Sequence, residues 1–340
     1  MNLEFIKSVI DHYVMQPSIM FTWCVGLMLL AFWKMHVIVR PRVAGFIGLL
    51  FVGYFAVSFL DPNFRSIAGR DDNVPILMML FSTLFFMWLG MYQGVKNDER
   101  MAKGLVPIEK EDTHLKAFCW PDLVFIELIA SILFTVFLTV WGLVLTAPLE
   151  QPAAPSKSPN PAKAPWYFLG LQEMLVYFDP WLAGVVFPTL IIIGLIAIPY
   201  IYKNRKGNGY YTFKERRAEI FLFSFGFFIL WVLLIFLGTF LRGPNWDFFG
   251  PYETWDAHKV SALANWNLSE LIYIKWMGAL GHPMTPPSQW YIREIPGIAI
   301  ILFYFCALPG MRKKKVLKKY YDKMGAVRYY VGVLLFLSMA

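Results

Sequence analysis

Residues 164–178 combine large aromatic side chains with a single carboxyl group, Glu173, between two long apolar runs. The aromatic side chains are Trp166, Tyr167, Phe168, Tyr177 and Phe178. A connecting segment usually lies at the surface and is rich in polar and turn residues. The combination therefore favours a half-buried pocket for a flat, apolar molecule that releases protons.

A helix that begins at Trp166 would place Trp166, Leu169 or Gly170, Glu173 and Tyr177 on one face, because these positions follow helical spacing. An apolar, aromatic surrounding disfavours the ionised form of a carboxyl group. Glu173 would then be suited to accept a proton from a hydroquinone. An interfacial amphipathic helix with Glu173 facing lipid headgroups explains the same spacing. The residues alone leave both interpretations open.

Two further acids, Asp122 and Glu127, lie at the start of an apolar run. A charge at the centre of a membrane helix costs roughly 2.5–3.5 kcal/mol. Glu127 follows Pro121 by about 9 Å along a helix. Either acid could serve proton uptake or contact a quinone carbonyl at an inner site. Asp122 could instead stabilise the positive N-terminal end of its own helix.

The histidines and cysteines exclude several kinds of metal centre. The five histidines are His12, His36, His114, His258 and His282. Only His36 touches a predicted span, so we expect no buried haem b within this chain. The three cysteines form neither CxxC nor CxxCH, which gives no support for covalent haem c or cysteine-bound zinc. We therefore predict no metal ligands here.

The composition predicts a membrane protein. Hydrophobic residues make up 58% of the 340 positions and charged residues only 16%, which a soluble domain rarely shows. We predict an all-α polytopic transmembrane bundle of seven to eight spans. The predicted spans are 18–38, 43–60, 75–95, 121–147, 183–202, 218–241, 294–310 and an eighth from 327. The net charge of +8 resides in short basic loops, which indicates membrane topology rather than nucleic-acid binding.

The basic loops follow the first, fifth and seventh predicted spans. If the spans alternate, these loops share one side, which the charge bias makes cytoplasmic. The N-terminus and the loops 61–74, 148–182 and 242–293 then lie outside. The last of these is rich in tryptophan, and it either faces a partner or forms an interfacial aromatic belt.

Over about residues 121–241 the chain resembles the C-terminal half of cytochrome b, and in particular subunit IV of the plastoquinol complex of photosynthesis. The shared features are Trp120-Pro121-Asp122-Leu123, Pro148-Leu149-Glu150, a Pro-rich lead-in, Pro165-Trp166-Tyr167-Phe168 with Gln172, Gly184 and Pro199. The resemblance implies an outer quinol-oxidation pocket walled by Pro165, Trp166, Tyr167, Phe168 and Leu169. It also implies a weaker role for Asp122 at an inner quinone site.

The chain departs from that family at one position. The family carries a proton-accepting glutamate immediately before the Trp-Tyr pair, where this chain has Pro165. A proline cannot take up a proton. The candidates that remain are Glu173, two helical turns further on, and an acid from a partner subunit.

The resemblance implies a membrane subunit of a quinol:cytochrome c oxidoreductase of the cytochrome bc type, catalytic only within its complex. Its substrate would be a quinol of the menaquinone type. Haem b, and iron–sulfur or haem c, would belong to a separate haem-b-bearing subunit and to a Rieske protein or c-type cytochrome. A dimeric complex in a bacterial cytoplasmic membrane is expected. A non-catalytic membrane scaffold that docks periplasmic redox proteins is the alternative, and a transporter is disfavoured because polar residues are scarce within the spans.

These inferences divide the chain into four predicted regions. They are an added three-helix element (1–115), the subunit IV-like region (116–241), the Trp-rich outer loop (242–293) and the C-terminal span or spans with a basic loop (294–340).

Overall fold

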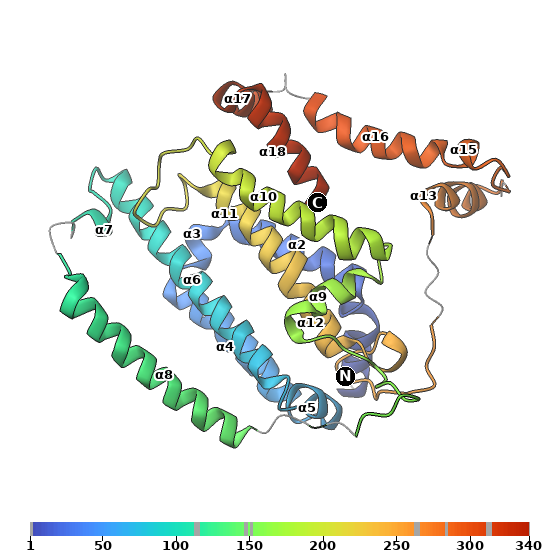
Figure 1. Ribbon diagram of the computed structural model, residues 1–340, viewed down its shortest axis with the longest axis horizontal. Helices are drawn as coiled ribbons and strands as arrows, with labels where there is room; N and C mark the ends of the chain where they lie inside the picture. The colour runs from blue at the N-terminus through green and yellow to red at the C-terminus, as the bar shows by residue number, and fades with distance from the viewer. Residues whose placement is uncertain are drawn as a thin grey trace. The chain divides into compact units, whose positions relative to one another are not determined.

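The structure is a computed structural model that describes residues 3–111, 116–145, 149, 152–261, 266–282, 285–310 and 315–339. Within these ranges the regular structure is helical, and the only strand-like pairing is one bridge between Arg242 and Phe248 (Figure 1). The predicted all-α class is confirmed. The chain forms two compact units, Met1–Glu173 with Lys206–Val260, and Met174–Arg205 with Ser261–Ala340.

Five described helices are long and apolar enough to cross a membrane. They are Pro41–Ser58, Val74–Ala102, Cys119–Val144, Leu182–Ile201 and Arg217–Leu241, and they match the second to sixth predicted spans. Near the last two predicted spans the helices α16 (Ile295–Gly310) and α18 (Ala326–Met339) are shorter than the roughly 20 residues that a span needs. The described chain therefore has fewer full-length spans than the predicted seven to eight.

The first predicted span is helix α2 (Pro17–Trp33), which meets the preceding helices α1 (Leu3–Val9) and η1 (Ile10–Val14) at a bend of 84°. The bend occurs at Gln16, whose extended backbone precedes a proline at the first helical position. We treat α2 as the spanning part and residues 3–14 as a segment that lies across its end.

The core of the first unit joins the N-terminal helices to the last long helix of that unit. The N-terminal helices are α2, α4 (Pro41–Ser58), α5 (Pro62–Ala68) and α6 (Val74–Ala102). The long helix runs through α11 (Arg217–Ser224), η4 (Phe225–Val232), α12 (Leu233–Phe236) and η5 (Leu237–Leu241). Buried side chains from both sets form one cluster, which includes Phe55, Ile76, Leu233 and Leu237. The N-terminal helices therefore pack directly on the long helix α11–η5.

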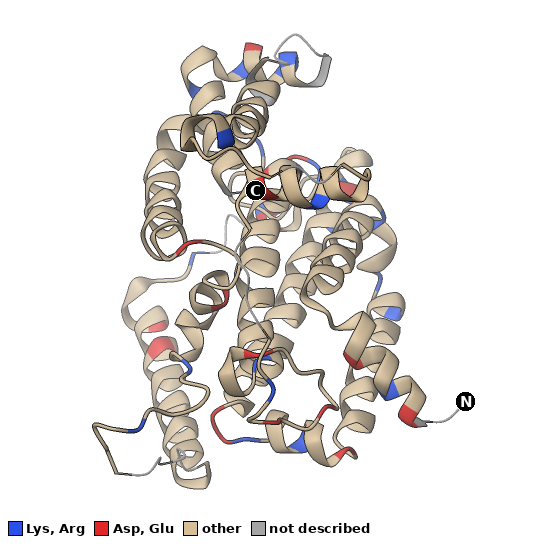
Figure 2. Ribbon diagram, turned by 90° about the vertical axis from the view of Figure 1, so that its right-hand side faces the viewer, with Lys and Arg blue, Asp and Glu red and all other residues tan. Residues whose placement is uncertain are grey.

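Charged residues concentrate at helix ends and in loops (Figure 2). At one end of the first unit, Lys7 pairs with Asp61 at 2.7 Å, and Asp61 also caps the start of α5. Beside them, the backbone N–H of Tyr252 donates to Asp11 at 3.1 Å. The segments 3–14, 61–73 and 242–260 therefore meet at one end, as the alternating topology predicts.

The opposite end of the first unit holds the loop before α11 against α6. Buried Asp98 of α6 accepts hydrogen bonds from the Thr212 hydroxyl at 2.6 Å and from the backbone N–H groups of Phe213 and Lys214. The neighbouring Asn97 donates to the carbonyl of Tyr211 at 3.0 Å. The segments 96–111 and 206–216 thus lie together, again as the alternation predicts.

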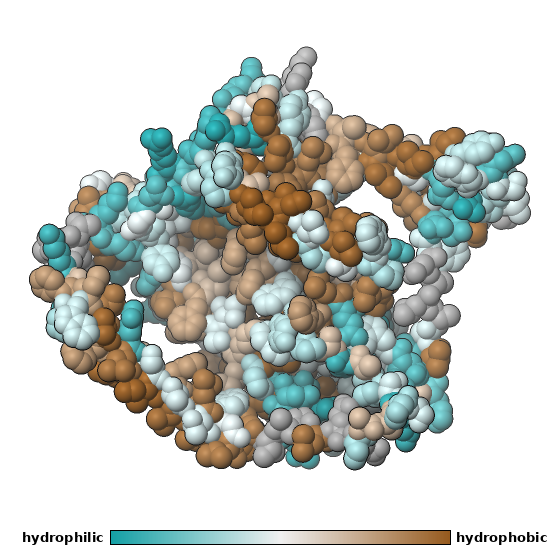
Figure 3. All heavy atoms as spheres, in the orientation of Figure 1, coloured by the Kyte–Doolittle hydropathy of each residue, from teal (hydrophilic) through white to brown (hydrophobic). Residues whose placement is uncertain are grey.

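Helix α8 (Val124–Val144), preceded by η2 (Cys119–Leu123), differs from the other long helices of its unit because none of its residues is buried. Its surface is almost wholly apolar (Figure 3). A helix of this kind is suited to lipid or to a membrane partner.

The second unit is smaller. It contains η3 (Leu182–Val186), α10 (Phe187–Ile201), α16, α17 (Lys315–Met324) and α18. Helix α18 packs on α10 and α16, and the Tyr304 hydroxyl donates to the Leu337 carbonyl at 2.9 Å. The predicted Trp-rich region is divided, since 242–260 belongs to the first unit and the remainder to the second.

Candidate functional site

Helix α9 (Trp166–Met174) begins where the spacing predicts, with the Phe168 N–H donating to the Pro165 carbonyl at 2.8 Å. It ends at Met174, so Tyr177 lies beyond the helix. The side chains of Trp166, Tyr167 and Phe168 remain 40%, 47% and 53% exposed, whereas Leu169 is buried. The helix is therefore anchored through Leu169, Gly170 and Glu173, while the rings of Trp166, Tyr167 and Phe168 stay partly exposed in its first turn.

Two glycines allow α9 to approach the long helix closely. A Cβ atom at Gly238 would lie 2.9 Å from Cδ2 of Leu169 and 3.3 Å from its carbonyl oxygen. A Cβ atom at Gly170 would lie 3.4 Å from the carbonyl oxygen of Trp231. Contacts this short leave no room for larger side chains. The position of α9 is thus set by backbone contact.

The Pro-rich lead-in is fixed by an amide side chain of α9. Gln172 accepts a hydrogen bond from the Ala164 N–H at 2.8 Å and donates to the Ala162 carbonyl at 2.9 Å. Further along, Asn160 and Asn245 form two hydrogen bonds with each other, at 2.6 and 3.0 Å. Asn245 adopts a left-handed backbone with φ of 60°, which asparagine tolerates better than most residues. The lead-in is therefore held to both α9 and the segment after η5.

Glu173 is fully buried and forms an ion pair with Arg242, which directly follows η5. The guanidinium donates from Nη2 to Oε1 at 2.7 Å and from Nε to Oε2 at 3.0 Å, and its Nη1 donates to the Trp246 carbonyl at 3.1 Å. Charge-assisted hydrogen bonds of this two-point kind are strong and fix the geometry of both side chains. The pair therefore links α9, the end of the long helix and the segment that follows η5.

Sequence reasoning did not identify Arg242, because the arginine lies 69 positions from its partner. A usable signal was present, since Arg242 is a lone basic residue at the outer end of an apolar span. A basic side chain there needs either solvent or a buried acid as its partner.

Lys163 is a second candidate side chain that the sequence alone does not single out. Its ammonium donates to the Thr239 carbonyl at 2.8 Å and lies 5.0 Å from the centroid of the Trp255 ring. A cation at this carbonyl also faces the negative end of η5. Burial lowers the pKa of Lys163 to about 8. The outer end thus contains a titratable group two residues before Pro165.

Three buried polar atoms near Lys163 and Arg242 lack a hydrogen-bond partner within the described part of the chain. They are the Thr239 hydroxyl and the indole nitrogens of Trp246 and Trp255. Buried donors normally find a partner in protein, water or ligand. An oxygen atom of water or of a bound molecule would suit this group of donors.

The two acids near α8 lie away from α9. Asp122 is exposed in η2 and Glu127 is exposed in the first turn of α8, whereas the loop toward α9 leaves from the other end of α8. In the described residues, the Asp122 side chain forms no capping hydrogen bond at the start of η2 or α8. Within the described residues, no three histidine, cysteine, aspartate or glutamate side chains lie close enough together to hold a metal ion. His114 lies outside the described residues.

Residues 152–253 match the protein family described as cytochrome b (C-terminal)/b6/petD. The matched range includes α9, α10, the long helix α11–η5 and Arg242, but not α8. No curated protein and no solved structure matches the chain. The resemblance predicted from the motifs is confirmed for this region, and it supports a membrane subunit of a cytochrome b-type complex.

Proposed function

We propose that this chain is a membrane subunit of a quinol:cytochrome c oxidoreductase and contributes one wall of its outer quinol-oxidation site. One observation carries the proposal. The family-matched helix α9 is fixed at the outer end of a membrane-length helix while Trp166, Tyr167 and Phe168 stay exposed. Exposed aromatic rings on a rigid support are suited to a flat substrate that a second subunit encloses.

The substrate would be a membrane quinol of the menaquinone type, bound against Pro165, Trp166, Tyr167, Phe168 and Leu169. Burial of its ring stabilises the complex by roughly 25 cal/mol per Å² of apolar surface removed from water. Leu169 is itself buried against Gly238 of the long helix, so it would fix the position of α9 beside the quinol. Asp122 remains a weaker candidate for an inner quinone site, at the other end of α8.

Electron acceptors would lie on partner chains. A separate haem-b-bearing subunit would take one electron, and a Rieske protein or a c-type cytochrome the other. The complex would be a dimer in a bacterial cytoplasmic membrane, with the N-terminus of this chain outside. Helix α8, none of whose residues is buried, offers an apolar surface for such a membrane neighbour.

Glu173 is the proposed proton acceptor, and the ion pair sets a condition on that role. The Arg242 guanidinium must turn away from at least one carboxylate oxygen before a quinol hydroxyl reaches it. During such a turn, the hydrogen bond from Nη1 to the Trp246 carbonyl would hold Arg242 in place. The ion pair would then act as a gate between the buried carboxylate and the quinol.

The test replaces Glu173 by Gln in the intact complex. We expect quinol oxidation to slow by about 10²-fold or more, the range for loss of a general base. The complex should still assemble, but with lower stability, because the variant leaves buried Arg242 without its carboxylate partner. Glu253→Gln is the matched control, because Glu253 pairs with Lys259 in the same outer region. Unchanged turnover in Glu173→Gln would remove Glu173 from the mechanism.

A second variant tests the pocket wall independently of the ion pair. Phe168 is half exposed, so Phe168→Ala should leave folding intact and raise KM for quinol. A quinone-site inhibitor should also lose affinity for this variant. Full inhibitor binding would favour the alternative of a non-catalytic scaffold. The packing of Trp255 on Phe249 inside the first unit does not favour Trp255 as a docking surface for such a scaffold.

A further inference from the structure

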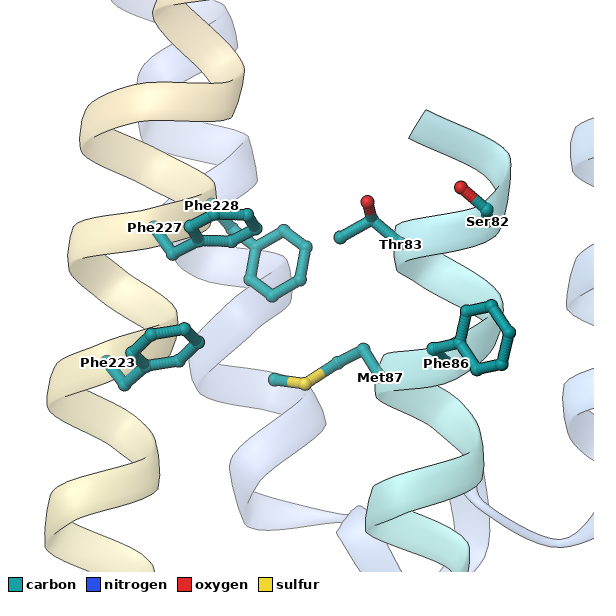
Figure 4. Close-up of a pocket in the computed structure, with 7 residues that line it drawn as sticks. All are labelled: Ser82, Thr83, Phe86, Met87, Phe223, Phe227 and Phe228. Atoms are coloured by element: carbon teal, nitrogen blue, oxygen red, sulfur yellow. The ribbon is translucent and has the colours of Figure 1, made fainter. Parts of the chain in front are cut away.

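The first unit carries an apolar hollow between α6 and the helix α11–η4. In this hollow, Phe223, Phe227 and Phe228 extend from one helix toward Thr83 and Met87 of the other (Figure 4). Phenyl rings, thioether groups and hydroxyl groups line the hollow, and none of them carries a charge that would select one occupant. Helix α17 of the second unit differs from it, because its charged side chains are gathered on one face.

Helix α17 (Lys315–Met324) has an apolar face and a charged face over residues 317–324. The apolar positions follow helical spacing, and they are Leu317, Tyr320, Tyr321 and Met324. The charged positions lie on the opposite face with exposed side chains, and they are Lys318, Lys319, Asp322 and Lys323. A basic helix whose two faces are so distinct is typical of helices that lie in the interface between membrane and water.

The apolar face fixes α17 against α18. The Tyr321 ring meets the Tyr329 ring edge to face, with 5.3 Å between their centroids, and Tyr329 is only 2% exposed. Gly325 turns the chain between the two helices with a φ of 82°, a left-handed conformation that favours glycine. Helix α17 therefore lies across the first turns of α18, and its charged face is the one that α18 does not cover (Figure 1).

The helices on both sides of α17 are apolar and hold it at one membrane surface. Helices α16 and α18 pack side by side, and apolar side chains such as Ile301, Phe303 and Leu334 are exposed on them. Helix α17 follows the first of these helices and precedes the second, and its ten residues extend only about 15 Å. Within that reach, α17 stays at the level of the lipid headgroups.

The lysines of the charged face are not engaged elsewhere. No hydrogen bond or ion pair ties the ammonium group of Lys318, Lys319 or Lys323 to a residue that the structure describes. Asp322 is the one acid of α17, so the face has a net positive charge. Nearby, Arg328 donates from Nε to a backbone carbonyl of α10 at 2.7 Å and adds a further positive charge. Three ammonium groups are therefore available to an anion at this surface.

We propose that α17 binds the phosphate groups of anionic phospholipids in the adjoining leaflet and so fixes the C-terminal helices to that membrane surface. Lys318, Lys319 and Lys323 would contact the phosphates. Tyr320, which is 45% exposed at the margin of the apolar face, would reach the boundary of the hydrocarbon. Each lysine held at an anionic surface raises the affinity about fivefold. A zwitterionic lipid carries its own ammonium group, which offsets the phosphate charge, so the preferred lipid has a net negative charge.

The position of the lysines favours lipid over an acidic protein as their partner. They lie between two helices whose exposed side chains are apolar, at the level of the headgroups. An acidic protein would have to enter the headgroup layer, where lipid phosphates compete for the same ammonium groups. The aromatic ring of Tyr320 beside the lysines is also typical of a side chain at a membrane interface.

The proposal is tested on the full chain in its complex, in nanodiscs of phosphatidylcholine and phosphatidylglycerol. Cys24, Cys119 and Cys306 are replaced by serine, and Tyr320→Cys carries a fluorophore. At constant lipid composition, one lipid or the other is supplied with brominated acyl chains, which quench a fluorophore on contact. We expect stronger quenching by brominated phosphatidylglycerol than by brominated phosphatidylcholine. This preference should weaken as the salt concentration is raised, because salt screens exposed charges.

Two substitutions on the charged face should change the preference in opposite directions. Lys319→Gln should lower the preference for phosphatidylglycerol about fivefold. Asp322→Asn removes the one acid of α17 and should raise the preference by a similar factor. Lys103→Gln is the matched control, because it removes an exposed lysine in the first unit and should leave the quenching unchanged. Opposite changes from two exposed positions cannot both come from a loss of folding.

Equal quenching by the two brominated lipids would overturn the proposal, and so would a preference that neither Lys319→Gln nor Asp322→Asn changes. A fluorophore quenched by aqueous iodide but by neither lipid would show that the charged face is only solvated. A fluorophore shielded from both lipids and from iodide would identify a protein partner instead. None of these outcomes depends on the role of α9 in quinol oxidation.

Discussion

The ion pair between Glu173 and Arg242 joins the candidate chemistry to the stability of the site. Both side chains are at least 95% buried, so removal of one partner leaves a charge without compensation. The usual cost of such a loss is about 3–5 kcal/mol, whereas removal of both charges is often neutral. The pair that would have to open before Glu173 could accept a proton therefore also fixes α9 to the end of η5.

A second buried acid gives a prediction for pH dependence. Burial raises the pKa of Asp11 to about 6, and the hydrogen bond from the Tyr252 N–H opposes this shift. The folded state then binds more protons than the unfolded state between about pH 4 and 6. The cost of ionised Asp11 is fully present above pH 6 and disappears as the pH falls. Glu253 and Asp61 add to it by repulsion, and His12 opposes it.

Asp11→Asn removes this cost and keeps an oxygen acceptor for the Tyr252 N–H. We expect a higher Tm than that of the natural chain at pH 8 and a difference that shrinks toward pH 4. Thermal unfolding in detergent at several pH values measures it. A His12→Gln background prevents the histidine from contributing. A Tm difference that is independent of pH would contradict the assigned burial of Asp11.

At the scale of the elements, α9 depends on the glycine contact with the long helix. Gly238→Leu places carbon atoms where Leu169 now lies, so α9 must move away. We expect a loss of about 1–3 kcal/mol in stability and a larger loss of quinol oxidation, because the aromatic wall shifts with α9. Turnover and Tm of the purified complex measure both effects.

Gly45→Leu in α4 is the control for this substitution, since its side chain would meet nothing within 4 Å. Normal turnover in Gly238→Leu would show that the position of α9 does not govern the site.

At the scale of the whole molecule, the predicted topology assigns each connecting loop to one side of the membrane. Lys157 lies in the exposed Pro-rich lead-in, and Lys103 lies in the exposed turn after α6. In a background with Cys24, Cys119 and Cys306 replaced by serine, Lys157→Cys should react with a membrane-impermeant maleimide on intact cells. Lys103→Cys should react only after the membrane is broken. The reverse pattern would invert the predicted topology.

Several features of the fold and site could be predicted from local sequence. Apolar runs of membrane length predicted the second to sixth spans correctly, because a helix must have about 20 apolar residues to cross the hydrocarbon core. The start of α9 at Trp166 followed from helical spacing after Pro165. The last predicted spans were less accurate, since α16 and α18 fall short of a full span. Hydropathy shows that a segment is apolar but not where its helix ends.

The amino-acid sequence by itself determined the all-α class, the aromatic segment before the fifth predicted span, and the family resemblance that the match at 152–253 confirms. Only the tertiary structure decided that Arg242 neutralises Glu173, that Lys163 faces η5, and that the N-terminal helices pack on the long helix α11–η5. The physical reason is the range of the interactions. Helical spacing and hydropathy act between neighbours along the chain, whereas ion pairs and packing join residues that only folding brings together.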